Sequence, residues 1–199
     1  MELFETETFS EAVRQKSAQG LRKNPRKQVA NKSPQNGCRR ECEERLRRNG
    51  CAYFVAHSHR GKLPLAGEWL KTRLERYTDR AGVKEFAHGF DELLRNAHES
   101  GNFGLDGPSR RALARAGRLE EVITRLENGD VKLITVRLLT LPGEAQVIVQ
   151  DQGAGFDFHR YLAGGAESHE GGIRRCARFF DQLRYCGGGS VACAVKKFD

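Results

Sequence analysis

The stretch from Phe90 to Gly101 puts a carboxylate and an amide on one face of an expected helix. Glu92 and Asn96 are four residues apart, so on a helix their side chains lie one above the other. Carboxylate and amide oxygens suit Mg²⁺, which takes its remaining ligands from water and phosphate. Taken alone, this pair is more typical of a solvent-exposed helix face than of a metal site.

A second candidate is the sequence Asp151-Gln-Gly-Ala-Gly155, which directly follows an expected strand. Glycines at positions 153 and 155 allow the backbone to turn sharply and to approach a ligand closely. Asp151 at the strand end is placed to accept a hydrogen bond from an exocyclic amine. The spacing favours a ligand-binding loop, although a plain turn has the same pattern.

A third candidate is the glycine pair Gly171 and Gly172 at the start of an expected helix. Backbone N–H groups at a helix N-terminus, together with the positive end of the helix dipole, favour phosphate. Arg174 and Arg175 follow directly and add positive charge, unless they are simply solvated.

Hydrophobic patterning predicts the elements that must position these residues. Strands are expected at residues 51–58, 131–139 and 144–151 and in a final hairpin over 181–198. Helices are expected at residues 41–50, 63–82, 84–100, 108–129 and 173–180. Because the strands are segregated from the helices, we predict an α+β two-layer sandwich with helices on one face of a mixed sheet.

Basic residues concentrate at the beginning of the chain. The first 49 residues hold 12 Lys and Arg against 7 Asp and Glu, and the whole chain has a formal net charge of +8. This segment has too few large apolar residues to offset the entropy of ordering. We therefore predict a flexible basic arm over residues 1–49 and one domain over 50–199. A solvated tail is favoured over contacts with nucleic acid or acidic lipid.

The expected location is the cytoplasm. No run of residues approaches the roughly 18–20 apolar residues that a membrane span requires. The first residues are acidic and lack the basic and apolar regions of a signal peptide. The 6 cysteines are scattered along the chain, which suits reduced thiols better than a disulfide framework.

A zinc site is also considered for the cysteines near the expected domain boundary. Cys38, Cys42 and Cys51 are followed by His57 and His59. Their spacing fits none of the regular zinc-binding patterns, so metal binding there is not expected.

Taken together and in this order, the three candidate stretches resemble the N, G1 and G2 boxes of histidine-kinase-like ATPases, the GHKL superfamily. The most similar branch is that of bacterial anti-sigma regulatory serine/threonine kinases. That branch carries ELLxNAxEHGNxG, GRLEE, DxGxGFD and FDxLxY, and this chain has ELLRNAHESGNFG, GRLEE, DQGAGFD and FDQLRY before CGGGS. The resemblance covers roughly residues 50–199 and implies the Bergerat type of two-layer sandwich.

The resemblance also implies roles for individual residues. Asn96 is expected to coordinate a Mg²⁺ ion that bridges the phosphates of ATP, and Glu92 is expected to be the general base. Residues 156–170 correspond to the lid over the nucleotide. The residues expected to bind the nucleotide itself lie in the two glycine-rich stretches: Asp151, Gly153, Gly155, Gly171 and Gly172. The chemistry is phosphoryl transfer, which depends on positioning and charge neutralisation.

The implied function is an ATP- and Mg²⁺-dependent regulatory serine/threonine protein kinase of bacterial signal transduction. Its protein partner would be an anti-sigma antagonist that it phosphorylates or a sigma factor that it sequesters, and a homodimer is permitted. Three positions depart from the family pattern: Glu170 in place of a glycine of the phosphate box, Ser100 in place of His, and Ser190 in place of Asn. A carboxylate at position 170 repels phosphate. The alternative is therefore a degenerate, non-catalytic switch that uses the same fold to bind a partner.

Overall fold

The computed structural model describes residues 43–156, residue 158 and residues 172–198. The expected arm up to residue 42 lies outside the described residues. So do Gly171, Glu170 and most of the expected lid.

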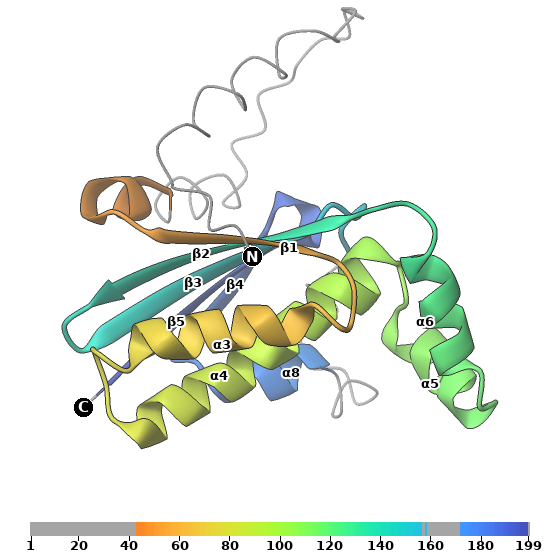
Figure 1. Cartoon of the computed structure of the whole chain (residues 1–199), viewed down its shortest axis with the longest axis horizontal. Coiled ribbons are helices and arrows are strands. Elements are labelled where there is room, and N and C mark those ends of the chain that lie inside the picture. Colours follow the sequence, from red (N-terminus) through yellow and green to blue (C-terminus); the bar gives the residue numbers. More distant parts are fainter. Residues whose placement is uncertain (1–42, 157, 159–171, 199) are drawn as a thin grey trace, which may run out of the picture. The chain divides into compact units, whose positions relative to one another are not determined.

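A five-stranded sheet forms the centre of the described fold (Figure 1). Its strands are β1 (Ala52–His57), β2 (Leu133–Leu141), β3 (Glu144–Gln150), β4 (Gln182–Cys186) and β5 (Val191–Lys197), in the order β1-β2-β3-β5-β4. Every neighbouring pair is antiparallel, so the prediction of a mixed sheet is wrong. The reason is that β2–β3 and β4–β5 are hairpins and that the helices between β1 and β2 return β2 antiparallel to β1. The connection through α8 leads to β4, which runs in the same direction as β3, but β5 lies between these two strands.

Three helices cover one face of this sheet: α3 (Leu63–Leu74), α4 (Arg80–Arg95) and α8 (Gly172–Ala177) (Figure 1). The main core lies between them and the sheet. α4 contributes Phe86, Phe90 and Leu94, which are almost completely buried. Since these residues recur at intervals of four, one stripe of α4 is apolar and packs on strand residues such as Val136 and Val149.

The helix predicted over residues 63–82 ends earlier than expected, and the next helix begins before residue 82. α3 ends at Leu74, and α4 begins after Asp79, whose side chain accepts a hydrogen bond from the N–H of Gly82 at 2.8 Å. An Asp in this position satisfies an otherwise unpaired N–H and fixes the start of a helix. After Arg95 the chain continues as a π-helix, η1 (Asn96–Asn102).

The single helix predicted over 108–129 is two helices, α5 (Gly107–Arg115) and α6 (Leu119–Glu127). Gly117 separates them with a φ of 68°. This left-handed conformation costs little for glycine and ends α5.

A short helix over residues 43–49 packs on the face of the sheet opposite α3 and α4. Its Leu46 is buried in a second, smaller cluster with Leu139, Ile148 and residues of β4 and β5. Arg45 forms an ion pair with Glu144 of β3, and Glu43 lies 4.0 Å from Arg137 of β2. The helix predicted at 41–50 is therefore present, and the packed fold begins before residue 50.

Candidate nucleotide site

The end of α4 carries the predicted carboxylate and amide. The backbone N–H of Asn96 donates to the carbonyl oxygens of Glu92 and Leu93, so the two predicted residues lie on consecutive helical turns. The Glu92 side chain is mostly buried and forms two ion pairs, one with Arg95 and one with Arg175 of α8, whose Nε lies 3.4 Å from Glu92 Oε1. Two guanidinium groups thus neutralise this carboxylate.

Asp151 lies at the end of β3 in a buried position, with an exposed fraction of 7%. Its backbone N–H donates to the carbonyl of Ser190 at 3.0 Å, and its Oδ1 accepts from the N–H of Gly153 at 2.8 Å. Burial raises the pKa of Asp151 to about 6, against the opposing effect of the backbone hydrogen bonds. The carboxyl group therefore titrates close to neutral pH.

The two glycines predicted to shape a pocket are both required by close backbone packing. A Cβ on Gly153 would overlap the carbonyl oxygen of Gly101 in η1. Gly155 has a φ of 79°, and a Cβ there would overlap the carbonyl of Gly188 in the β4–β5 connection. That same carbonyl accepts from the N–H of Phe156 at 2.9 Å. The Asp151–Gly155 loop is therefore held between η1 and the Gly187–Gly189 turn.

Two buried side chains that the sequence did not single out, Tyr185 and Cys176, lie near the predicted residues. Burial raises the pKa of Tyr185, the charge of Asp151 also raises it, and the Asn96 side chain opposes this. Burial, and secondly the Glu92 carboxylate, raise the pKa of Cys176 to about 12. Glu92 is therefore close to Cys176, Asn96 and Asp151 are close to Tyr185, and Cys176 in turn acts on Tyr185.

Several polar atoms in this region are buried without a hydrogen bond of normal geometry among the described residues. Asn96 Nδ2 and Tyr185 Oη are two of them, although these groups lie near each other. A buried polar atom without a partner costs about 1–3 kcal/mol. The Asn96 amide and the Tyr185 hydroxyl can partly satisfy each other, and a ligand or water that bonds them would satisfy them more fully, so these residues fit a polar ligand at this place.

Aromatic side chains fill the region beside these atoms. Phe158 stacks on Tyr185 with ring centroids 5.7 Å apart, and Phe156 meets the same ring edge-on at 5.3 Å. These rings belong to the main core. Phe156 and Phe158 therefore pack around Tyr185, beside the candidate site.

The remaining positions are the two glycines of the expected phosphate box and the two serines that depart from the family pattern. Gly172 is the first described residue of α8, and its neighbour Gly171 is outside the described residues. Ser100 Oγ donates to the carbonyl of Leu105 at 2.9 Å, and Ser190 Oγ donates to the carbonyl of Gly187 at 2.8 Å. Both serines thus stabilise their own turns.

A buried polar network fixes η1 from the other side. Ser58 Oγ lies 2.9 Å from His98 Nδ1, and His98 Nε2 lies 3.2 Å from Glu127 Oε1 of α6. The backbone N–H of Arg60 donates to the same carboxylate at 2.6 Å. Although serine, histidine and a carboxylate in a row suggest nucleophilic catalysis, Ser58 and His98 are 5% and 1% exposed. Burial lowers the pKa of His98, and the network serves to hold η1, α6 and the β1–α3 loop together.

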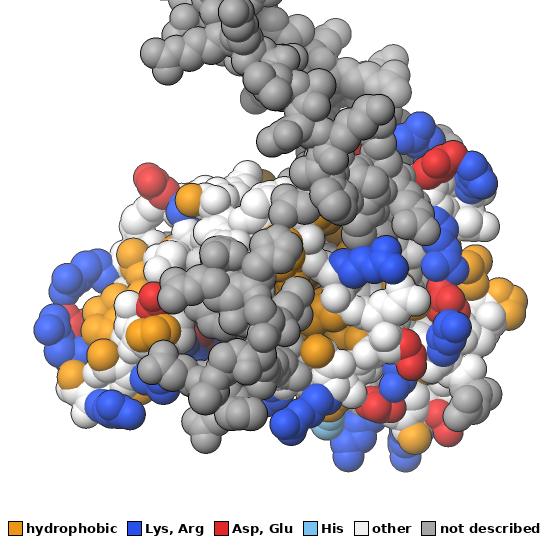
Figure 2. Space-filling model, turned by 180° about the vertical axis from the view of Figure 1, so that it is seen from behind, with side chains coloured by type: hydrophobic (Ala, Val, Ile, Leu, Met, Phe, Trp, Pro, Cys, Tyr) orange, Lys and Arg blue, Asp and Glu red, His pale blue; other side chains and the backbone are white. Residues whose placement is uncertain are grey.

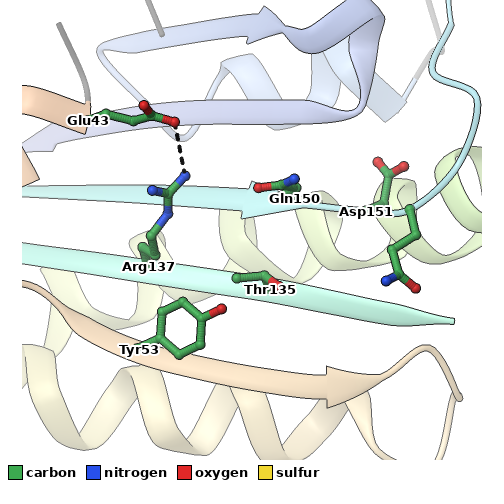
Figure 3. A pocket seen from close by; sticks show the side chains of 7 residues that line it. Glu43, Tyr53, Thr135, Arg137, Gln150 and Asp151 are labelled. Carbon is green, nitrogen blue, oxygen red and sulfur yellow. Dashed lines mark ion pairs between the residues drawn. The ribbon is translucent and has the colours of Figure 1, made fainter. Parts of the chain in front are cut away.

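A pocket of about 300 Å³ lies elsewhere, on the face of the sheet that α3 and α4 do not cover (Figure 3). Asp151 lines one end of it, whereas Glu92 and Asn96 are not among its lining residues. It therefore meets the region around Tyr185 at Asp151 and otherwise lies on the other face of the sheet.

Neither a comparison with protein-family models nor a comparison with curated proteins finds a match to this chain. Among the described residues, no three His, Cys, Asp or Glu side chains are grouped so that they could hold a metal ion. Cys38 and Cys42 lie outside these residues. Within the same part of the chain, no helix is both long and apolar enough to cross a membrane.

Proposed function

We propose that this protein is an ATP- and Mg²⁺-binding regulatory serine/threonine protein kinase with a fold of the Bergerat type. The observation that carries the proposal is that the three predicted residues border one buried pair of side chains: Glu92 acts on Cys176, and Asn96 and Asp151 act on Tyr185, on which Cys176 also acts. These residues come from α4, η1 and the end of β3. This placement of residues from separate stretches supports the proposal.

In this proposal the chain supplies binding and orientation. Asn96 would hold the Mg²⁺ ion, and Asp151, when ionised, would accept the exocyclic amine of adenine. Gly153 and Gly155 would allow close backbone approach, and the start of α8 at Gly172 would face the phosphates. Bound Mg²⁺ neutralises the charge that develops on the transferred phosphoryl group.

A specific observation favours a second candidate, a non-catalytic switch that binds its partner without phosphorylating it. Glu92 is ion-paired with Arg95 and Arg175, and a carboxylate held in this way is not free to orient a hydroxyl group. For Glu92 to orient a hydroxyl group, at least one of these ion pairs has to open. If neither opens, the same region would respond to nucleotide without transferring phosphate.

The proposed partner is a cytoplasmic protein of bacterial signal transduction, namely a sigma factor or an anti-sigma antagonist, and the kinase would act as a monomer or homodimer. Nucleic acid is not proposed as a partner. In the face drawn in Figure 2, Lys and Arg side chains of the described residues lie scattered among acidic and hydrophobic ones. A basic surface that follows a phosphate backbone would instead be continuous.

Calorimetric titration of Mg·ATP into the full chain tests the proposal. Asn96→Ala and Asp151→Asn are expected to remove the binding heat, whereas Asn128→Ala, at the exposed end of α6, is expected to leave it unchanged. Failure of the folded wild-type chain to bind Mg·ATP would refute the kinase and would favour the partner-binding switch, which does not need nucleotide.

Phosphate release and transfer from labelled ATP then separate the two candidates. The kinase requires transfer that Glu92→Gln abolishes and that Arg175→Met leaves intact or increases. Nucleotide binding without turnover in wild type and in Arg175→Met identifies the switch.

A further inference from the structure

The pocket on the second face of the sheet is built from polar side chains of neighbouring strands. Tyr53 of β1 pairs with Arg137 of β2, and Thr135 of β2 pairs with Gln150 of β3. Because side chains alternate along a strand, these four lie on the same face, opposite to core residues such as Val136. Figure 3 shows them side by side above the sheet, with Glu43 at one end and Asp151 at the other.

The polar groups of this pocket are largely unused by the residues that the structure describes. Among the described residues, the side chains of Tyr53, Thr135 and Gln150 form no hydrogen bond, ion pair or ring contact, and 55% of Tyr53 is exposed. A hydroxyl, a phenol and an amide thus converge on one cavity with their hydrogen-bonding capacity available to a ligand.

Arg137 supplies the positive charge of the pocket, with the carboxylate of Glu43 beside it and that of Asp151 at the other end. Its side chain is 21% exposed, and within the described part of the chain its ion pair is with Glu43, whose Oε1 lies 4.0 Å from Arg137 Nη2. At this separation the pair lacks the two parallel hydrogen bonds that a guanidinium forms with a well-placed carboxylate. A ligand carboxylate that approaches more closely would therefore take the place of Glu43.

We propose that this pocket binds a small carboxylate ligand with an amide and a flat ring, a molecule of the size of an acylated amino acid. Its carboxylate pairs with Arg137, its amide bonds to Thr135 and Gln150, and its ring lies against Tyr53. The volume of about 300 Å³ is at the lower end of the range for ligand pockets. This proposal does not depend on nucleotide binding, because the polar groups that it uses lie on the opposite face from Asn96.

Hippurate, which joins a benzene ring, an amide and a carboxylate, is a suitable probe, and hippuramide is its uncharged match. Each compound is titrated into the ¹⁵N-labelled full chain, and the signals of the Gln150 side-chain amide and the Arg137 backbone amide are followed. Hippurate should shift both signals with saturation, and hippuramide should bind at least about tenfold more weakly.

Two variants change the pocket in opposite directions. Arg137→Met should weaken hippurate binding about tenfold or more, whereas Glu43→Gln should strengthen it roughly two- to fivefold because the competing carboxylate is gone. Arg111→Met removes an equal charge from the exposed surface of α5 and should leave binding unchanged. The proposal is wrong if hippurate leaves the Gln150 signal unmoved, if hippuramide binds equally well, or if Glu43→Gln weakens binding.

Discussion

The carbonyl oxygen of Gly101 occupies the place that a β-carbon on Gly153 would need. η1 and the loop after β3 therefore meet backbone to backbone at this point. A Cβ on Gly101 would in turn overlap the carboxylate of Asp151.

We expect Gly153→Ala to destabilise the protein by several kcal/mol, about the cost of overpacking a rigid site. Gly104→Ala is the control, because Gly104 has a φ of 65° but nothing within 4 Å of its Cβ position. This control should cost only about 1 kcal/mol for the backbone conformation. Urea unfolding of both variants measures the difference, and equal costs would contradict the contact.

Asp151 should make the folded state less stable as the pH rises. Burial raises its pKa from the ordinary 3.8 to about 6, so between these values the folded state keeps a proton that the unfolded chain has lost. The stability contributed by the protonated group is complete below about pH 4 and is lost as the pH rises through about 6. Relative to Asp151→Asn, the wild-type free energy of unfolding should fall by roughly 2–3 kcal/mol over this window.

Urea unfolding of wild type and Asp151→Asn at several pH values measures this change. Because both proteins share all other titrating groups, their difference isolates Asp151. A difference that stays constant with pH, or that grows in favour of wild type, would show that the carboxyl group has an ordinary pKa.

Removing the buried carboxylate of Glu127 should destabilise the protein by roughly 2–4 kcal/mol, because Arg60 and His98 would lose their shared partner. Glu121→Ala is the matched change on the same helix. Glu121 is 56% exposed and pairs with Arg125 at the surface, so its loss should cost less than about 1 kcal/mol. Similar unfolding midpoints for Glu127→Ala and Glu121→Ala would rule out a structural role for the network.

Leu46→Ala should destabilise the full chain by roughly 2–4 kcal/mol, the usual cost of a cavity left by a buried leucine. Leu46 is 3% exposed, whereas Leu65 of α3 is 55% exposed. Leu65→Ala should therefore change the free energy of unfolding by less than about 1 kcal/mol. If the two variants unfold at the same urea concentration, the helix over 43–49 does not pack on the sheet in solution.

The α+β class and the positions of the strands were predictable because they depend on local hydrophobic patterns. The antiparallel arrangement was not predictable, since it depends on how β5 returns beside β3. The sequence shows a glycine at position 117, but it does not show that this glycine takes a left-handed conformation and ends α5.

In the candidate site, too, the residues that belong to a local sequence pattern were predicted, and those brought together by the fold were not. Gly153 and Gly155 were identified because glycine lets the backbone turn sharply and approach a ligand, whereas the close contacts that the structure shows are with the backbones of Gly101 and Gly188. Tyr185 and Cys176 were missed because each looks like an ordinary core residue in its own segment. Ser58 and His98 are 40 residues apart in the chain, and no local pattern joins them.

The helix over residues 43–49 has a practical consequence for the solubility of shortened forms. It covers Leu139, Ile148, Val191 and other apolar residues on the second face of the sheet. A fragment that begins at residue 50 would expose this face to water, and exposed apolar strand surface promotes self-association. Aggregation of such a fragment would then reflect a missing cover and not a failure of the sheet to form.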